Sequence, residues 1–310
     1  MKPTIFVRIP FPPESLALLQ QEFTVRYVPT RPEFEDALAT SGAEARGIVA
    51  NGTVGLSADH IAAMPNLEMI HTIGIGYENV DLDACRARGI VVANNAGINF
   101  FSVAEHAIGL LLALYRGIPE GDRDVRNGLW DEVRHPRPLI FRKKVGIIGL
   151  GEVGLAIAKR IEAFEAMVGY HNRKPRDVPY DYYGSVLDLA EASDVIFIAC
   201  PGGPETRHLV DAPVIKALGP QGVIINVGRG SVVDEEALVK ALHEGALGGA
   251  AIDVFDTEPK FPDALAGAPN LIVSPHIAGR SPEAIAFARE QILNNFKAHF
   301  AGGQVVHRLV

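Results

Sequence analysis

The stretch from Lys144 to Gly154, with the sequence KVGIIGLGEVG, has the clearest chemical pattern in the chain. Gly149, Gly151 and Gly154 fit the pattern G-x-G-x-x-G, with an apolar strand-like run before them and a helix-forming run after them. In that setting the glycines permit a tight turn, close approach of a pyrophosphate, and close packing of helix on strand. The pattern predicts dinucleotide binding at the positive end of a helix beginning near Glu152. An ordinary tight turn is the alternative.

The segment about twenty residues beyond the glycines indicates which dinucleotide binds. In NAD-specific sites an Asp or Glu there binds the ribose 2′-hydroxyl. Here the expected strand end carries Asn172, Arg173 and Lys174, and no carboxylate occurs before Asp177. An arginine beside a lysine can pair with a 2′-phosphate. We therefore predict NADP(H) in preference to NAD(H), which stays open as a second cofactor. A solvated basic turn is the alternative.

Three later segments follow expected strand ends: Val227-Gly228-Arg229-Gly230, Asp256-Thr257-Glu258-Pro259 and Ser274-Pro275-His276-Ile277-Ala278-Gly279. The surrounding runs INVGRGSVVDEEAL, AIDVFDTEP and NLIVSPHIAG closely resemble the D-isomer-specific 2-hydroxyacid dehydrogenases. Within that family the resemblance is to the glyoxylate/hydroxypyruvate reductase and hydroxyphenylpyruvate reductase branch, and it covers almost the whole chain. It implies NADPH-dependent reduction of small 2-oxo acids such as glyoxylate, hydroxypyruvate or arylpyruvates to D-2-hydroxy acids. The family's catalytic Arg/Glu/His set falls here on Arg229, Glu258 and His276.

These residue types suit the chemistry of 2-oxo acid reduction. Hydride delivered to the ketone carbon leaves negative charge on the oxygen, which must receive a proton. His276 can supply that proton in reduction and take it back in oxidation, while Glu258 orients the ring and favours its charged form. Arg229 can bind the substrate carboxylate and polarise the ketone. Taken singly, each residue could equally be a solvated loop or turn residue.

The resemblance also assigns the other cofactor contacts. With the residues named above, the expected set is Gly149, Leu150, Gly151, Glu152, Val153, Gly154, Asn172, Arg173, Lys174, Cys200, Pro201, Thr206, Val227, Gly228, Arg229, Asp253, His276, Gly279 and Val103. Val103 is expected to line the nicotinamide pocket. Asp253 is expected to bind the carboxamide, or alternatively to cap a strand end. Family members often have Leu-Thr after the proline at Pro201, whereas this chain has Gly202-Gly203, which predicts a more mobile loop.

Two loops in the first part of the chain are candidates for the substrate carboxylate, because each follows an expected strand end. The substrate contacts expected from them and from the catalytic set are Asn51, Gly52, Gly74, Ile75, Gly76, Arg229 and His276. The glycines on either side of Ile75 can expose successive backbone N–H groups, which form a concavity suited to an anion. Plain turn glycines are the alternative. The 2-oxo acids differ in the group that points away from the carboxylate, and these residues do not show which such group the site accepts.

The elements that must position these residues alternate between strand and helix along the chain, which predicts parallel sheets covered by helices. We predict an α/β protein with two Rossmann-like, doubly wound parallel-sheet domains and an active-site cleft between them. Residues 1–97 with 284–310 form the expected flavodoxin-like substrate domain, to which a helix at 281–300 returns the chain. Residues 98–283 form the expected dinucleotide domain, with six strands.

Residues 99–117 form an expected long helix that is apolar on nearly every side, so it must be covered all round. Residues 121–143, with Trp130, indicate an irregular arm. A helix and arm of this kind (about 99–143) predict a homodimer, and an intramolecular role is the alternative. Trp130 could stack on an aryl substrate, but we favour a packing role.

Composition narrows the range of partners. The chain has 310 residues, a net charge of −8 and no block of basic residues, which argues against nucleic acid or an anionic membrane as a partner. Its two cysteines form neither a disulfide framework nor a metal-binding spacing. Prolines interrupt the N-terminal region where a signal peptide needs an apolar run, and no expected helix is long enough to cross a bilayer. A cytoplasmic protein without a bound metal is expected.

Three other functions remain to be separated from 2-oxo acid reduction. A phosphoglycerate dehydrogenase is possible within the family, although the long C-terminal extension common there is not found in this sequence. Formate dehydrogenase chemistry needs no proton donor, so a Glu258–His276 pair argues against it. A nucleotide-sensing protein, like the corepressors that share this fold, would tolerate the same residues. NADPH oxidation with hydroxypyruvate or glyoxylate separates an enzyme from such a sensor.

Overall fold

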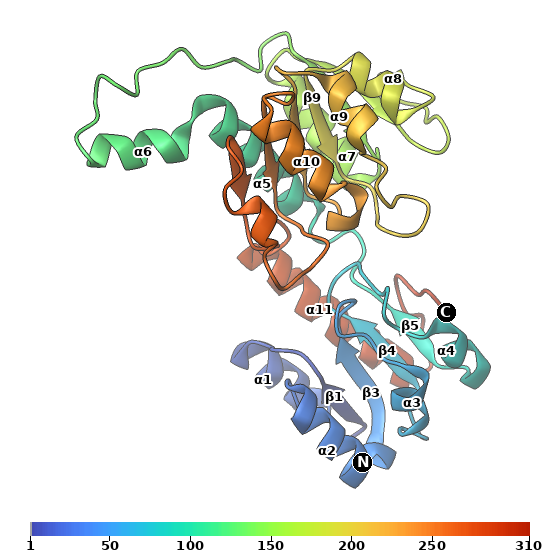
Figure 1. Ribbon diagram of the computed structural model, residues 1–310. Helices are drawn as coiled ribbons and strands as arrows, with labels where there is room; N and C mark the ends of the chain where they lie inside the picture. The colour runs from blue at the N-terminus through green and yellow to red at the C-terminus, as the bar shows by residue number, and fades with distance from the viewer. Residues whose placement is uncertain (1) are drawn as a thin grey trace. The chain divides into compact units, whose positions relative to one another are not determined.

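The computed structural model describes residues 2–310, and the chain divides into two compact units. Unit 1 contains the residues up to Ile98 together with Ser281–Val310, and unit 2 contains Asn99–Arg280. Figure 1 follows the chain through both units. Unit 1 is therefore built from both ends of the sequence, whereas unit 2 is continuous.

Unit 1 contains a five-stranded parallel sheet with the order β2-β1-β3-β4-β5. Its strands are β1 (Thr4–Val7), β2 (Thr24–Tyr27), β3 (Ala45–Ala50), β4 (Met69–Thr72) and β5 (Val91–Ala93). This is the strand order of flavodoxin-like sheets, in which ligands bind beyond the carboxyl ends of the strands. The predicted α/β class is confirmed for this part of the chain.

Helices cover the sheet of unit 1 on both faces. They are α1 (Pro13–Glu22), α2 (Arg31–Ser41), α3 (Ala58–Ala62), α4 (Leu82–Arg88) and α11 (Pro282–Phe300), with a 3₁₀ turn η1 at Gly42–Glu44. The core on one face is built around Phe34 of α2, and the core on the other face around Phe296 of α11. Because a Cβ at Gly47 would lie 2.6 Å from the Phe296 ring, α11 packs directly on β3.

A buried histidine joins α11 to the sheet. The side chain of His71 on β4 is 0% exposed, and both its ring nitrogens are bonded. Nδ1 lies 3.0 Å from the carbonyl oxygen of Thr72 and must donate to it, while Nε2 accepts from Asn295 Nδ2 at 3.0 Å. Asn295 also exchanges two hydrogen bonds with the backbone of Val306. Burial lowers the pKa of His71 from 6.5 to about 4, so the ring is neutral in the folded protein.

We expect unit 1 to lose stability in mild acid because of His71. The unfolded chain binds a proton near the ordinary pKa of 6.5 and the folded chain only near 4, so stability present above pH 6.5 is lost as the pH falls to 4. The loss reaches about 3 kcal/mol at most. Urea unfolding between pH 7 and pH 4.5 measures it in the wild type, in His71→Gln and in the exposed-site control His135→Gln. Equal acid losses in the wild type and His71→Gln would contradict this role.

Unit 2 contains a seven-stranded parallel sheet with the order β12-β11-β10-β9-β6-β7-β8. Its strands are β6 (Lys144–Ile148), β7 (Met167–His171), β8 (Asp181–Tyr182), β9 (Val195–Ile198), β10 (Val223–Asn226), β11 (Gly249–Ile252) and β12 (Leu271–Val273). The order reverses between β6 and β9, which is the switch point where doubly wound sheets bind dinucleotides. The six predicted strands are present, and β8 is a two-residue edge strand that the sequence pattern did not indicate.

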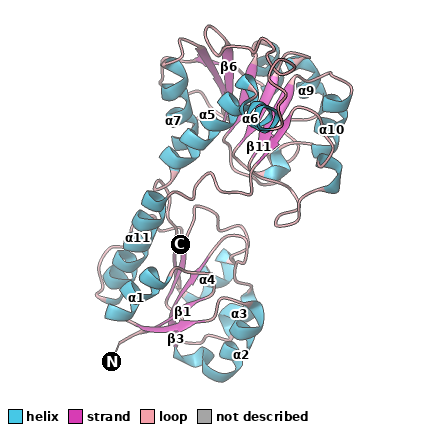
Figure 2. Cartoon of the chain, turned by 90° about the vertical axis from the view of Figure 1, so that its left-hand side faces the viewer, coloured by secondary structure: helices cyan, strands magenta, loops and turns pink. Residues whose placement is uncertain are grey.

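Helices also cover both faces of this sheet, as Figure 2 shows. They are α5 (Phe100–Arg116), α7 (Glu152–Glu162), α8 (Val186–Glu191), α9 (Ala212–Leu218) and α10 (Glu235–His243), with 3₁₀ turns η2 (Gly230–Val232) and η3 (Asp263–Leu265). The helix α6 (Ile118–Arg126) follows α5 and has no buried residue. One core lies under α5 and α7, and the other under α8, α9 and α10. The predicted doubly wound class is confirmed here as well.

The helix α5 leaves a stripe exposed within the single chain, at Phe101, Glu105 and Gly109. The prediction that this helix is covered all round, by the domains or by a second subunit, is not tested by a single chain. The segment after α5 differs from its prediction. The expected irregular arm begins with the helix α6, and Figure 1 shows α6 and the loop after it projecting from unit 2. Pro119 in its first turn and the Asp122–Arg126 ion pair, four residues apart, both favour that helix.

Membrane-spanning potential is confined to these two helices. In the described part of the chain no single helix is long and apolar enough to cross a bilayer, whereas α5 and α6 together pass that test but are bent by 55°.

Candidate active site

The glycine turn between β6 and α7 has the shape that a dinucleotide site requires. Gly149 has a φ of +93°, and a Cβ there would lie 2.6 Å from the backbone N of Cys200. A Cβ at Gly154 would lie 2.2 Å from the carbonyl oxygen of Gly149. A Cβ at Gly151 would instead meet no atom within 4 Å, so the approach to α7 is open there. Since Gly151, the N-cap of α7, supplies no side-chain cap, the first N–H groups of the helix can bind a pyrophosphate.

The other predicted contacts of this turn lie around it. Leu150 is buried, and Glu152 and Val153 form the first turn of α7. Asn172, just after β7, accepts a hydrogen bond of 2.7 Å at Oδ1 from the N–H of Leu150. Arg176, which the sequence analysis did not single out, donates to the carbonyl of Leu150. The segment after β7 therefore holds the glycine turn by hydrogen bonds to both the N–H and the carbonyl of Leu150.

The two basic residues of the expected 2′-phosphate site, Arg173 and Lys174, are exposed. Arg173 Nη1 lies 3.2 Å from Glu205 Oε2, which belongs to the segment after β9. The two side chains are 89% and 78% exposed, so water and salt screen the pair and it contributes little stability. A phosphate dianion can therefore replace Glu205 as the partner of Arg173.

The segment from Cys200 to Thr206 lies beside the glycine turn. Cys200 is buried, and burial raises the pKa of its thiol to about 11. The thiol therefore stays protonated at neutral pH, and a ligand here would contact the backbone N–H or carbonyl of Cys200. Thr206 Oγ1 donates to the carbonyl of Pro201 at 2.8 Å, which closes this loop on itself. A Cβ at Gly202 would lie 3.0 Å from Cγ of Arg229, so the loop also borders the expected catalytic arginine.

Three further predicted cofactor residues are packed inside unit 2. Val103 is buried in the core under α5, and Val227 is buried just after β10. A Cβ at Gly279 would lie 2.5 Å from Nδ2 of Asn99, so the Asn99 side chain lies directly against this position.

The loop that carries Arg229 follows β10 directly and is held by one buried amide. Asn226 accepts at Oδ1 from the N–H of Gly228 and donates from Nδ2 to the carbonyl of Arg229, both at 3.0 Å. A Cβ at Gly230 would lie 1.9 Å from the backbone C of Phe255. The arginine loop therefore lies directly against the segment that leads to Glu258.

Glu258 and His276 form the expected pair. His276 Nδ1 lies 2.6 Å from Glu258 Oε2, and the N–H of Phe255 donates to Glu258 Oε1 at 2.8 Å. Burial by itself raises the pKa of Glu258, but these two hydrogen bonds and the charges of His276 and Arg229 outweigh it and hold that pKa below its ordinary value. The carboxylate is therefore ionised at neutral pH. Because Nδ1 is bonded to Glu258, Nε2 is the ring atom that remains to exchange a proton with a ligand.

Asp253 follows β11 and holds the segment that carries His276. Its side chain is 1% exposed and accepts from the N–H of Ile277 at 3.0 Å and from the N–H of Ala278 at 2.9 Å. This is the capping role that the sequence analysis gave as an alternative. A carboxylate offers about four acceptor sites, so these bonds leave room for a carboxamide as well.

The two candidate carboxylate loops of unit 1 lie against each other. A Cβ at Gly52 would lie 2.6 Å from the backbone C of Gly76. Asn51 accepts at Oδ1 from the N–H of Val54 at 2.7 Å, which fixes the turn of the first loop. Both loops follow strand ends, β3 and β4, as predicted, and they meet at one edge of this sheet.

Two buried asparagines that the sequence analysis missed hold the second loop. Asn94 Nδ2 donates to the carbonyl of Ile75 at 2.8 Å, and Asn95 Nδ2 donates to the carbonyl of Ile73 at 2.9 Å. Among residues 2–98 and 281–310, which the structure describes in unit 1, no acceptor is bonded to the N–H groups of Gly74, Ile75 and Gly76. The loop thus has its carbonyls bound and its N–H groups available to an anion.

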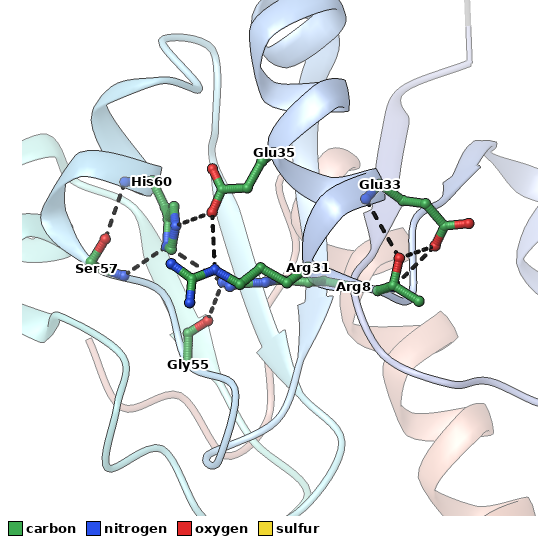
Figure 3. Close-up of polar contacts among 8 residues, drawn as sticks. Arg8, Arg31, Glu33, Glu35, Gly55, Ser57 and His60 are labelled. Atoms are coloured by element: carbon green, nitrogen blue, oxygen red, sulfur yellow. Dashed lines mark hydrogen bonds and ion pairs between the residues drawn. The ribbon is translucent and has the colours of Figure 1, made fainter.

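Arg8 supports the first loop from within unit 1 (Figure 3). This side chain, which follows β1, is 5% exposed. Its Nη1 donates to the carbonyl of Gly55 at 2.6 Å and lies 3.4 Å from His60 Nδ1, while the guanidinium lies 4.1 Å from the centre of the Phe34 ring. Burial lowers the pKa of Arg8, and Glu35 partly opposes that change. A buried cation is thereby fixed behind the Asn51–Gly55 loop.

The fold and the glycine turn together define an α/β protein of the dinucleotide-binding class. The sequence model of the family described as "D-isomer specific 2-hydroxyacid dehydrogenase, NAD binding domain" matches residues 108–278. The chain belongs to this family of D-isomer specific 2-hydroxyacid dehydrogenases. The predicted resemblance and the predicted class of cofactor are confirmed.

Two curated relatives and one solved structure show the closer similarity. The chain is 43% identical over 295 residues to glyoxylate/hydroxypyruvate reductase A of Arabidopsis thaliana, which covers 94% of each chain. It is also 43% identical over 275 residues to hydroxyphenylpyruvate reductase of Plectranthus scutellarioides, with 88% of each covered. The NADPH-dependent glyoxylate/hydroxypyruvate reductase of Sinorhizobium meliloti, solved with NADP and malonate, superposes with a TM-score of 0.91 at 37% identity, covering 100% of this chain and 97% of that one.

Proposed function

We propose that this protein reduces small 2-oxo acids to D-2-hydroxy acids with NADPH, with His276 as the proton donor. The observation that carries the proposal is the 2.6 Å contact between His276 Nδ1 and Glu258 Oε2, beside the Arg229 loop and on the dinucleotide-binding sheet. The names of the relatives, which include glyoxylate, hydroxypyruvate and hydroxyphenylpyruvate reductases, support this substrate class.

The residues of unit 2 divide the reaction between them. NADPH, when bound at the glycine turn, supplies the hydride to the ketone carbon. His276 gives the Nε2 proton to the oxygen on which negative charge grows, and the ionised Glu258 stabilises the imidazolium before that transfer. Arg229 binds the substrate carboxylate and polarises the ketone, so its charge acts where the transition state becomes negative. In the reverse direction His276 takes the hydroxyl proton.

Unit 1, considered by itself, also has groups suited to a carboxylate. The N–H groups of Gly74, Ile75 and Gly76 are available to an anion, and Asn51-Gly52 lies against them. The charge of Arg8 behind the first loop favours an anion at this edge of the sheet. The pocket for the remainder of the substrate is left to be determined by assay.

NADPH is proposed in preference to NADH, which lacks the 2′-phosphate. The reason is that Arg173 and Lys174 stand where NAD-specific sites have a carboxylate. The change Arg173→Ala is expected to raise KM for NADPH about tenfold, the cost of one charge-assisted hydrogen bond, and to leave KM for NADH unchanged. Steady-state rates with both cofactors measure this. The matched control is Arg86→Ala, an exposed arginine on α4 whose partner is Asp83. A wild-type kcat/KM for NADH that equals or exceeds that for NADPH would reject the preference.

A panel of 2-oxo acids assayed with NADPH and NADH tests the proposed function. Glyoxylate, hydroxypyruvate, hydroxyphenylpyruvate and 3-phosphohydroxypyruvate should be compared, with D-product formation checked by chiral chromatography. Turnover of one of the first three is expected. NADPH binding without turnover of any acid would favour the nucleotide-sensing alternative, and preference for the phosphorylated acid would favour a phosphoglycerate dehydrogenase.

A homodimer is proposed for the surface around α5 and α6. Large apolar side chains are exposed there, among them Phe101, Ile118, Val125 and Trp130. Exposed apolar groups gathered on a helix and an arm are typical of subunit interfaces. Light scattering at micromolar concentration should give twice the chain mass of 33.3 kDa, and a monomer mass would reject the proposal.

A cytoplasmic location stays a prediction.

A further inference from the structure

Two polar side chains on α5 contact the segment that carries His276. Ser102 and His106 lie one helical turn apart, on a helix whose buried face is otherwise apolar. Ser102 Oγ donates to the carbonyl of Ala278 at 2.6 Å, and His106 Nε2 lies 2.9 Å from Ser274 Oγ. The two contacts therefore bind the segment on both sides of His276.

The direction of the hydrogen bonds can be assigned from the acceptors. Ser274 Oγ has one proton and donates it to Asp253 Oδ1 at 2.5 Å, because a carboxylate can only accept. The hydroxyl must then accept from His106, so Nε2 of His106 carries a proton. That nitrogen also lies 3.5 Å from Asp253 Oδ1. A chain of donors thus runs from His106 through Ser274 to a carboxylate that is 1% exposed.

The segment held in this way has a backbone that needs support. His276 has a φ of +52°, in the left-handed region that non-glycine residues adopt only when their surroundings require it. Its N–H donates to the carbonyl of Asp253 at 2.8 Å. The same aspartate therefore fixes the backbone of His276 directly and is itself fixed through Ser274 and His106.

We infer that His106, with Ser102, is a positioning residue for the proton donor His276. The inference rests on the proposed function for its kinetic consequences. His106 touches neither His276 nor Glu258 in these contacts, and acts by holding the 274–278 segment so that the imidazole meets Glu258. The helix of the proposed dimer surface thereby sets the geometry of the proton transfer.

Kinetics of matched variants test the inference. His106→Leu is expected to lower kcat about tenfold, because a misplaced donor loses alignment, while KM for NADPH stays within about twofold. His106→Gln, whose amide N–H can reach the position of Nε2, should restore at least half of the wild-type kcat. Ser102→Ala should lower kcat less than His106→Leu. The control is His243→Leu, at an exposed position on α10. Wild-type kcat in His106→Leu, or equal losses in the Leu and Gln variants, would overturn the inference.

Nuclear magnetic resonance of protein with ¹⁵N-labelled histidine tests the same point without turnover. His106 should show a single tautomer protonated at Nε2, and Ser274→Ala should shift that signal and the signal of His276. A His106 ring that exchanges between tautomers like a solvent-exposed histidine would overturn the inference even if His106→Leu fails to fold. Failure of the wild-type enzyme to turn over any 2-oxo acid would instead reject the proposed function, and the resonance result would still decide the contacts.

Discussion

The change His276→Asn is expected to lower kcat for 2-oxo acid reduction about 10³-fold, within the range that general acid catalysis contributes. Asparagine is the suitable replacement for two reasons. Its amide N–H can take the place of Nδ1 toward Glu258, and it tolerates the φ of +52° found at this position. The variant therefore keeps the shape of the segment and removes only the proton at Nε2. Steady-state rates with saturating NADPH and hydroxypyruvate measure the effect.

The control for this variant is His208→Asn, because His208 is an exposed histidine of the same unit with a left-handed φ of +50°. It should retain wild-type kcat and bind NADPH with wild-type affinity in a fluorescence titration. If His276→Asn kept kcat within about threefold of the wild type, another group would have to supply the proton, and the proposed mechanism would be wrong.

The change Arg229→Ala is expected to lower kcat/KM for the 2-oxo acid about 10³-fold, since one preorganised donor can contribute that much to transition-state stabilisation. The guanidinium is expected to bind the carboxylate and the ketone together, so KM for the 2-oxo acid should rise and kcat should fall. Arg229→Lys should recover only part of the loss, because an ammonium is a point charge and lacks the planar fork.

Arg207→Ala is the matched control for Arg229. Arg207 is an exposed arginine of the same unit whose partner is Asp256, at 3.2 Å. It should keep kcat/KM within about twofold, as expected for the loss of one surface ion pair. An Arg229→Ala variant that lost no more activity than this control would show that the substrate carboxylate is bound elsewhere.

Local sequence patterns were sufficient for the parts of the fold that depend on neighbouring residues. The glycine turn could be recognised because Gly149 and Gly154 sit between an apolar strand and an amphipathic helix, and each of them excludes a side chain in the structure. The Glu258–His276 contact was expected from the family resemblance of the segments that carry the two residues, and the structure brings the two side chains together.

The residues that hold these groups in place could not be predicted from local pattern. His106 is 168 positions from Ser274, and Asn95 supports the loop at Ile73 from the end of a different strand. Such contacts depend on the strand order and on which face of α5 meets the sheet, and neither leaves a signal in a short window of sequence. The helix α6 was missed for another reason: its charged residues and Pro119 look like those of a loop unless their four-residue spacing is considered.

A crystal structure of the protein with NADPH and the unreactive substrate analogue oxamate tests the central claim most directly. We predict that His276 Nε2 and the Arg229 guanidinium both lie within hydrogen-bonding distance of the analogue's carbonyl oxygen. Carbon C4 of the nicotinamide should lie about 3.5 Å from the adjacent carbon. A complex in which C4 faces away from both side chains, or in which neither contacts the analogue, would contradict the account.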